Sequence, residues 1–457
     1  MARLNAPNHL APIYTHEGAQ AVHIPPFAQL RRAVGACMLW EDQFYESGKF
    51  IADRIAELCG LCIPEDIARL AIHARSNLNL RHVPLLLCAE LLRQHPTFKS
   101  AATIALCIQR ADEMGEMLAV YWRSGIGPLD HQLRKGLQLA LPKFDEYGLA
   151  KYRKDNTRYN LRNVIRLART KPKTEAQREL WGRAVKGELV TPDTWEVALS
   201  SGADKRETWI RLLAEGKLGY FALLRNLRNM DQVGVPIELV DNAVKARKNG
   251  AHRILPFRYI AAMRAAPQHA PALDIALCDS IKQMIEPSGT TFILVDVSSS
   301  MYHKLSAKSD MTCIDAAAGL AALWPGKCRV FSFSEELVEC PPFRGLAGVQ
   351  AVVNSQIHSG TRLSVALGQL NTFMYNNDLG SIKDRLIVIT DEQCDSNVPS
   401  PIAKRAYMIN VASFRNGVGY GDRWTHIDGF SEGVIRYIVE AEGEGPSAAR
   451  AGGEDRL

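Results

Sequence analysis

One apolar stretch that ends abruptly in an acid and several hydroxyls constrains the fold more than any other part of the sequence. Residues 291–295 are aliphatic, aromatic or β-branched, which is typical of a buried parallel strand. The chain continues into Asp296, Ser298 and Ser300, so one carboxylate and two hydroxyls share a loop. Open α/β sheets bind ligands at the carboxyl ends of their strands. The pattern therefore predicts a ligand site here, and a plain serine-rich turn is the alternative.

The chain divides into two parts that differ in periodicity and in charge. From about residue 27 to residue 281, amphipathic helical stretches follow one another, which predicts an α-solenoid or a similar helical stack. After Ser288-Gly289 strands alternate with helices, which predicts a doubly wound parallel sheet. Residues 1–283 carry 40 Lys and Arg against 29 Asp and Glu, a net +11, whereas residues 284–457 carry 15 against 20, a net −5. We expect a basic helical module (1–283), an acidic α/β domain (284–440) and a disordered tail (441–457).

The individual elements follow from the same periodicities. The clearest expected helices of the first part are residues 64–76, 84–94, 101–114, 129–141, 161–170, 175–186, 192–199, 220–230, 236–248 and 256–265. In the second part we expect strands at residues 291–295, 329–334, 385–390 and 407–412, and helices at residues 313–323, 363–376, 402–405 and 431–439. Several of these helices begin with proline in the first turn, which is a normal helix start.

Cysteine usage and hydropathy narrow the class of protein. The ten cysteines are irregularly spaced in a long chain, which favours free thiols in a reducing compartment over a disulfide framework. Cys59 and Cys62 form a CxxC, but no second pair follows at zinc-site spacing, so we expect two buried thiols. No apolar run approaches the roughly 18 residues of a membrane span, and the N-terminus has no apolar signal core. These features predict a cytoplasmic protein.

Two further predicted strand ends supply oxygen donors. Thr361 comes just before the expected helix 363–376, and Asp391 ends the apolar run 386–390. Carboxylate and hydroxyl oxygens are hard donors that suit Mg²⁺. No phosphate-binding GxxxxGK[ST] loop, HExxH or GxSxG motif is present, so no catalytic arrangement stands out.

The order and spacing of these pieces resemble the von Willebrand factor A fold with its metal-ion-dependent adhesion site. The resemblance implies that Ser298, Ser300 and Thr361 ligate Mg²⁺ through their hydroxyls. Asp296 and Asp391 would ligate it directly or through water, and an open position would take an acidic group of a protein partner. The alternative is an intact but idle site that only orders its loops.

A basic stretch marks the helical part. Residues 151–173 hold nine Lys or Arg and a single acid, Asp155. Arg158, Arg162, Arg166 and Arg169 would share one face of a helix, where like charges repel and a polyanion such as RNA would relieve them. The alternative is a solvated face, or pairing with acids of a neighbouring helix. The cations of this stretch that we expect to bind RNA are Lys151, Arg153, Lys154, Arg158, Arg162, Arg166, Arg169, Lys171 and Lys173.

Other basic and aromatic side chains have several roles that the sequence allows. Arg253 and Arg258 belong to a second basic group that is also expected to contact RNA. For Arg225 and Arg228, a buried structural role and an RNA contact are equally compatible with the sequence. We expect Arg75 and Arg81 to be structural, and Tyr152 and Tyr159 to be able to stack on unpaired bases.

Five short motifs carry a second resemblance. They are Thr15-His16-Glu17-Gly18, Ala74-Arg75, Leu80-Arg81-His82-Val83-Pro84, Leu223-Leu224-Arg225-Asn226-Leu227 and Leu255-Pro256-Phe257-Arg258. In combination they resemble the TROVE module of the Ro 60 kDa autoantigen family, its bacterial orthologues and telomerase- and vault-associated proteins. An A domain follows this module directly in Ro, as it is expected to do here.

The resemblance implies a ring of HEAT-like helices closed by the A domain. Such a protein would bind small noncoding Y-like RNA on a basic outer surface, hold single-stranded ends of misfolded RNA in the ring, and tether RNA to an exoribonuclease. Arg169 replaces the family's histidine before Lys-Pro, which would keep a phosphate contact but lose base reading. We expect a monomeric, non-enzymatic RNA-binding protein. The alternatives are a Mg²⁺-dependent protein-interaction scaffold and, with less support, a metal-dependent hydrolase.

Overall fold

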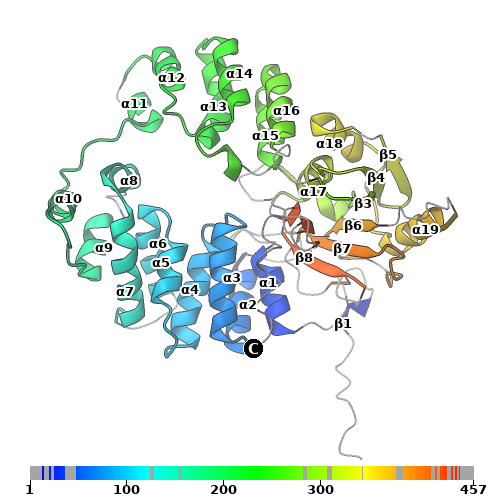
Figure 1. Ribbon diagram of the computed structural model, residues 1–457, viewed down its shortest axis with the longest axis horizontal. Helices are drawn as coiled ribbons and strands as arrows, with labels where there is room; N and C mark the ends of the chain where they lie inside the picture. Colours follow the sequence, from blue (N-terminus) through cyan, green and yellow to red (C-terminus); the bar gives the residue numbers. More distant parts are fainter. Residues whose placement is uncertain are drawn as a thin grey trace, which may run out of the picture. The chain divides into compact units, whose positions relative to one another are not determined.

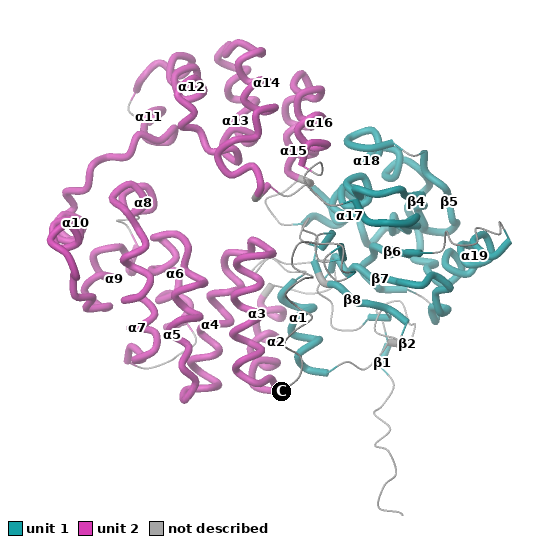
Figure 2. The backbone as a smooth tube through the Cα atoms, viewed as in Figure 1, with its two compact units in different colours: residues 1–37, 42–47, 281–457 teal, residues 38–41, 48–280 magenta. Residues whose placement is uncertain are grey.

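The computed structural model groups the chain into two compact units, a helical unit (residues 38–41 and 48–280) and an α/β unit (residues 1–37, 42–47 and 281–457) (Figure 2). The structure describes residues 13–14, 20–21, 25–35, 48–123, 128–153, 157–200, 202–254, 256–280, 286–305, 311–341, 343–376, 384–394, 396–412, 417–418, 423–429, 434–435, 438–439 and 442.

The helical unit is built from consecutive short helices (Figure 1). They are α2 (Gly48–Leu61), α3 (Pro64–Ser76), α4 (Val83–Gln94), α5 (Ala101–Cys107), α6 (Ala111–Arg123), α7 (His131–Ala140), α8 (Glu146–Lys151), α9 (Leu161–Ala168), α10 (Glu175–Lys186), α11 (Trp195–Ser200), α12 (Lys205–Ala214), α13 (Tyr220–Gln232), α14 (Ile237–Ala246), α15 (Pro256–Ala265) and α16 (Ala270–Asp279). Alternate helices pack on one another, with α2, α4 and α6 in one row and α3, α5 and α7 in the next. This stacking confirms the predicted helical repeat architecture.

Local sequence signals explain where the best-predicted helices begin and end. Helix α10 begins where the Thr174 hydroxyl accepts the backbone N–H of Gln177 at 3.2 Å. It ends at Gly187, whose φ of 86° requires the left-handed region that glycine adopts without strain. Helix α3 begins at Pro64, which needs no hydrogen-bond acceptor in the first turn. Both helices have the predicted bounds.

The predicted single helix 101–114 is wrong, because tertiary contacts divide it. Arg75 donates to the carbonyl of Cys107 at 3.1 Å and satisfies the end of α5. The Glu113 carboxylate accepts the backbone N–H groups of Gln109 and Arg110 at 2.8 and 3.0 Å, which satisfies the start of α6. These partners come from distant residues and from one buried carboxylate, so helical periodicity alone does not reveal the break.

The α/β unit contains a six-stranded sheet of order β5-β4-β3-β6-β7-β8. Its elements are β1 (Ile13–Tyr14), β2 (Gln20–Ala21), α1 (Pro26–Gly35), β3 (Thr291–Asp296), α17 (Cys313–Ala322), β4 (Cys328–Phe333), β5 (Leu337–Cys340), α18 (Gly345–Val353), α19 (Leu363–Asn376), β6 (Arg385–Thr390), β7 (Arg405–Asn410) and β8 (Thr425–Asp428). All neighbouring strands of this sheet are parallel except β5, which pairs antiparallel with β4. The predicted parallel sheet is confirmed, and β5 and β8 extend it at its two edges.

The strands place alternate side chains on opposite faces of the sheet. Phe292 and Leu294 of β3 and Val388 of β6 join one buried cluster with Leu367 and Leu370 of α19. Helix α17 also packs against β3 but contributes no residue to that cluster. The burial of β3 along its whole length agrees with the apolar run that predicted it.

Two predictions about the α/β part are wrong. Residues 402–405 do not form a helix, because Arg405 begins β7 in parallel register with Arg385 and must be extended. Glu442 does not belong to a disordered tail, since its side chain is 1% exposed and pairs with Arg385. Residues 443–457 lie outside the part of the chain that the structure describes.

The expected boundary at residue 283 also misplaces the first helix. Helix α1 packs against β8 of the α/β unit, although the sequence predicted that residues 1–283 form one helical module. Arg32 of α1 pairs with Glu392 at 3.0 Å, and both side chains are fully buried. A buried ion pair between residues so far apart leaves no local pattern in the sequence.

The cysteines have the predicted state. Every cysteine within the described ranges is a free thiol, and Cys59 and Cys62 are buried. None of the described helices has the length and apolar character that a bilayer crossing requires.

Candidate nucleic-acid interface and metal centre

Helix α9 carries only part of the predicted row of arginines. The helix begins after Asn160, whose side chain accepts a first-turn N–H at 3.0 Å. It ends at Arg169, which has a left-handed φ of 53°. Arg158 therefore lies in the turn before the helix and Arg169 caps its end, so the prediction of four arginines on one helical face is wrong.

Arg162 and Arg166 remain on α9, one turn apart and exposed. The opposite face of the helix packs against α6 and α7 and consists of Leu161, Val164 and Ala168. Arg169, Lys171 and Lys173 follow the helix and are also exposed. Within the described ranges, none of these five cations has an ion-pair partner. The surface around α9 is therefore an uncompensated cluster of positive charge.

The start of the basic stretch is more structural than predicted. The Arg153 guanidinium is half-buried and donates to the carbonyl of Gly187 at 3.1 Å, at the end of α10. Lys151 is exposed, and its ammonium lies 3.3 Å from the hydroxyl of Tyr147. Lys154 lies outside the described residues.

A second basic group gathers around an aromatic ring of α13. The guanidinium groups of Arg225 and Arg258 lie 5.6 and 5.3 Å from the ring centroid of Phe221. Burial and the nearby charge of Arg225 lower the pKa of Arg258. Arg225 and Arg228 are exposed, which excludes the buried alternative for both. The side chain of Arg253 lies outside what the structure describes.

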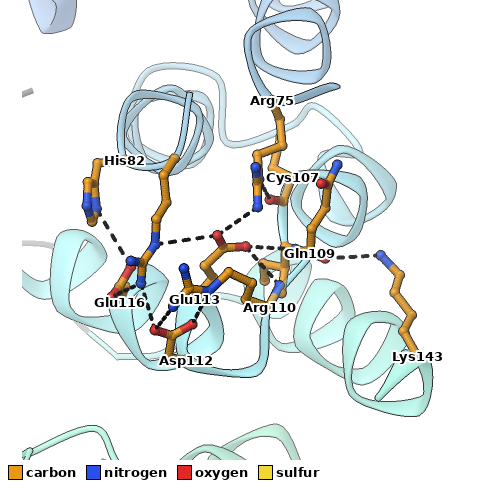
Figure 3. A network of polar contacts seen from close by, with 11 residues as sticks. Arg75, His82, Cys107, Gln109, Arg110, Asp112, Glu113, Glu116 and Lys143 are labelled. Carbon is orange, nitrogen blue, oxygen red and sulfur yellow. Dashed lines mark hydrogen bonds and ion pairs between the residues drawn. The ribbon is translucent and has the colours of Figure 1, made fainter. Parts of the chain in front are cut away.

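Arg75 and Arg81 have the structural role that we predicted. Figure 3 shows a network of polar contacts around α6 that includes Arg75 of α3 and His82, which directly precedes α4. Arg75 pairs with Glu113 at 2.8 Å. Arg81 pairs with Asp112 at 2.7 Å and with Glu116 at 2.5 Å. Their positive charges are therefore paired with carboxylates of α6 within the helical unit.

The two tyrosines next to the basic stretch are held by partners within the protein. The ring of Tyr159 stacks on Trp122 with centroids 5.1 Å apart and planes inclined by 17°. The ring of Tyr152 lies 4.2 Å from the guanidinium carbon of Arg110. The segment of Tyr159 approaches α6 closely at Gly115, where a Cβ atom would clash with the Tyr159 carbonyl. Each tyrosine therefore already has one partner for its ring.

Loops after two neighbouring strands bring acids and hydroxyls together at the carboxyl ends of the strands. The Asp296 carboxylate at the end of β3 accepts the Ser298 N–H at 2.9 Å and the Thr390 hydroxyl at 2.6 Å. The hydroxyl oxygens of Ser298 and Ser300 lie 3.1 Å apart. Asp391 follows Thr390 directly, so both carboxylates stand at the carboxyl ends of the adjacent strands β3 and β6.

A third loop brings Thr361 to the same end of the strands. The backbone N–H of Ser299 donates to the carbonyl of Ser359 at 2.9 Å. The Ser334 hydroxyl accepts the N–H of Ser359 at 2.8 Å and donates to the carbonyl of Gly360 at 3.0 Å. All five side chains predicted to hold a metal are therefore buried in loops that contact one another.

The donor set of these loops fits a divalent cation. Burial, together with the charge of Asp391, raises the pKa of Asp296 to about 7. A cation between the two carboxylates would counter both effects, and the hydroxyls of Ser298, Ser300 and Thr361 are hard donors of the kind that Mg²⁺ prefers. Within the described ranges, no three His, Cys, Asp or Glu side chains form a metal-binding group. A cation here would thus rely on hydroxyl ligands as well as on two carboxylates.

Two supports of this site were not predicted. Ser334 follows a strand and could have been found by the same strand-end argument that identified Asp296. Glu392 adopts a left-handed φ of 60° directly after Asp391 and is held there by Arg32 at 3.0 Å. Nothing in the local sequence indicates the Glu392 contact, because its partner lies in the first helix of the chain.

Comparisons with known proteins agree with this architecture. Residues 179–269 match the TROVE domain family. Telomerase protein component 1 of Mus musculus is 38% identical over 76 residues, and that of Rattus norvegicus is 37% identical over 76 residues. Each alignment covers 16% of this chain and only 3% of the length of the relative.

A solved structure matches almost the whole chain. The crystal structure of the Ro (RSR) protein of Deinococcus radiodurans aligns with a TM-score of 0.57 and 17% sequence identity. The alignment covers 91% of this chain and 100% of the other. At 17% identity this structural match shows similarity of fold alone. The TROVE match is separate from it and rests on the sequence of residues 179–269. Residues 179–269 therefore resemble a TROVE domain, and the chain as a whole has a fold similar to that of a Ro protein.

Proposed function

We propose that this protein binds structured RNA without cleaving it, through the cations around α9. The observation that carries the proposal is the exposure of Arg162, Arg166, Arg169, Lys171 and Lys173 without an ion-pair partner among the described residues. Five cations on one surface fit the spaced phosphates of a polyanion. The TROVE match and the Ro-like fold support a small noncoding, Y-like RNA as the ligand.

Two finer roles belong to the same proposal. Single-stranded RNA ends would contact the second basic group, where Arg225 and Arg258 flank the ring of Phe221. The bound RNA would then be presented to an exoribonuclease, for which this protein serves as an adapter. Free thiols throughout the described residues fit a reducing compartment such as the cytoplasm.

The test is a salt titration of RNA affinity. Purified protein should bind a labelled RNA hairpin in a gel-shift assay, and the logarithm of affinity should fall with the logarithm of salt with a slope of about −3 to −5. The same RNA incubated with protein and Mg²⁺ should remain uncut. Absence of binding at low salt would contradict the proposal, and cleavage would contradict its non-catalytic part.

For the α/β unit we propose a Mg²⁺ site held by Asp296, Ser298, Ser300, Thr361 and Asp391. The ion would leave a coordination position for a carboxylate of a protein partner. One observation favours such a docking function. Tyr302 and Ile357, which are 46% and 85% exposed, belong to the segments that carry these loops. A Mg²⁺-dependent scaffold is thus a second function that is compatible with RNA binding.

Thermal unfolding tests the metal proposal. Mg²⁺ at about 100 times its Kd should stabilise the unit by about 2.7 kcal/mol, which raises Tm by roughly 5–10 °C. Asp296→Asn should abolish this increase, because it removes one of two ligand charges. The control Glu339→Gln removes an exposed carboxylate of the same unit and should keep the full increase. An equal increase in Asp296→Asn and wild type would exclude Asp296 as a ligand.

A further inference from the structure

A cavity of about 430 Å³ lies next to the basic surface, entirely within the helical unit. One wall is α6, and the other is formed by the end of α8, the turn before α9 and the first residues of α9. Its volume is within the range of small-molecule sites, and it is large enough for one nucleobase. The proposed contacts of α9 with phosphates do not use this cavity.

Most of the cavity wall is apolar. Small side chains of α6 leave room on one side, and larger aliphatic side chains of α8 and α9 close the other. These lining residues are Ala111, Ala119, Leu149, Leu161 and Val164. Such walls favour a flat, uncharged group over an ion or a hydrated sugar.

Two aromatic rings line the same cavity, and each is fixed by a partner. Tyr159 is stacked on Trp122, and Tyr152 is held against the guanidinium of Arg110. Rings that are already ordered lose little conformational entropy when a further ring stacks on them. The cavity is therefore suited to a heteroaromatic ring.

The polar part of the wall includes the carboxylates of Asp112 and Glu116, beside the side chains of Thr157, Arg158 and Asn160. Arg81 pairs with both of them, at 2.7 and 2.5 Å, and Arg110 pairs with Asp112 at 2.9 Å, so two arginines balance the two carboxylates. Asp112 accepts N–H groups from both Arg81 and Arg110, whereas Arg81 donates to one oxygen of Glu116. A carboxylate has more acceptor sites than that single donor occupies, so Glu116 can also accept an N–H group of a neutral ligand, and the adjacent arginines disfavour a second cation.

Cations lie where the phosphates of such a ligand would be. Arg158 lines the cavity and is exposed, and Arg162 follows on the first turn of α9. A nucleotide with its base in the cavity would therefore keep its phosphate beside the surface proposed to bind RNA.

We propose that this cavity takes one unpaired nucleobase from the RNA bound on α9, and that it favours bases with an exocyclic amino group. The inference rests on the proposed RNA binding but adds a base-reading site to it. The amino group of adenine, guanine or cytosine would donate to Glu116, whereas uracil has no amino group and offers only its ring N3–H. With this site, a protein that otherwise contacts phosphates would select RNAs that have a bulged or flipped base.

The experiment compares matched hairpins that differ in one nucleotide. A single adenosine bulge is moved step by step along the stem, and each hairpin has a partner with an abasic bulge and another with a uridine bulge. At one position, wild type should bind the adenosine hairpin about 10-fold more tightly than the abasic one, as expected for one stacked base. Uridine should lie between them.

A cavity-filling variant provides the second measurement. Ala119→Phe changes an exposed residue of α6 that lines the cavity, so it should fill the space without disturbing the core. It should bind all hairpins with the affinity that wild type has for the abasic one. The control Ala102→Phe, at an exposed alanine of α5, should keep the discrimination. Thermal unfolding checks that both variants fold.

The outcomes separate this inference from the proposed function. RNA binding in which adenosine and abasic hairpins are equal at every position overturns the base site but leaves RNA binding intact. Discrimination that persists in Ala119→Phe also overturns it, because the base would then lie elsewhere. Failure of wild type to bind any hairpin overturns both.

Discussion

Replacing Arg162 and Arg166 together by glutamate should lower the affinity for a structured RNA by roughly 100-fold at moderate salt. Both side chains are exposed on α9 and have no ion-pair partner among the described residues, so the change would remove two of the proposed phosphate contacts and add two repelling charges. The slope of affinity against salt should also become shallower by about 2. The buried face of α9 is unchanged, so Tm should stay within a few degrees of wild type.

The control for this variant makes the same change of net charge elsewhere. Arg69 and Lys404 are 76% and 66% exposed and lie outside the α9 surface. Arg69→Glu with Lys404→Glu should therefore bind RNA with nearly wild-type affinity. Equal losses in the two double variants would show that total charge, rather than the surface around α9, determines binding.

Ending the chain at residue 440 should destabilise the α/β unit by about 3–5 kcal/mol, a fall of roughly 10 °C in Tm. Arg385 is fully buried at the start of β6, and its Nε donates to Glu442 at 2.7 Å. Tyr407 and Arg405 also donate to the Glu442 carboxylate, at 2.8 and 2.6 Å. Although burial opposes it, hydrogen bonds from Arg385 and Tyr407 lower the pKa of Glu442. Removing Glu442 leaves a buried guanidinium without its carboxylate.

A second truncation, ending at residue 444, keeps Glu442 and should have the Tm of the full chain. Differential scanning calorimetry of the two truncations measures the difference directly. Glu442→Gln in the full chain should give an intermediate loss, because it keeps the size of the side chain but removes its charge. If both truncations unfold at the same temperature, Glu442 does not hold Arg385.

Sequence reasoning succeeded where local signals determine the structure. The bounds of α10, α19 and β6 were predicted to the residue, because each has a regular apolar pattern between capping or turn residues. The loops with Asp296, Thr361 and Asp391 were found because strand ends at one edge of a parallel sheet must converge.

The failures concern residues whose partners are distant in the chain. The break between α5 and α6 depends on Arg75 and Glu113, and neither interrupts helical periodicity. The spacing of the arginines around α9 predicts one helical face, whereas the cap at Asn160 and the left-handed Arg169 limit the helix to the residues between them. The cavity beside α9 is formed by side chains of three separate segments, so no single stretch of sequence predicts it.

The attachment of α1 to the sheet has a consequence for synthesis on the ribosome. Arg32 emerges early, whereas its partner Glu392 emerges after the entire helical unit has been made. At ordinary elongation rates the interval is on the order of tens of seconds, during which the first helix has no sheet to pack on. The helical unit can fold in this interval from local contacts, since its helices pack on near neighbours in sequence. The α/β unit must therefore fold last. Until then its N-terminal segment has no folded partner, so chaperones can bind it.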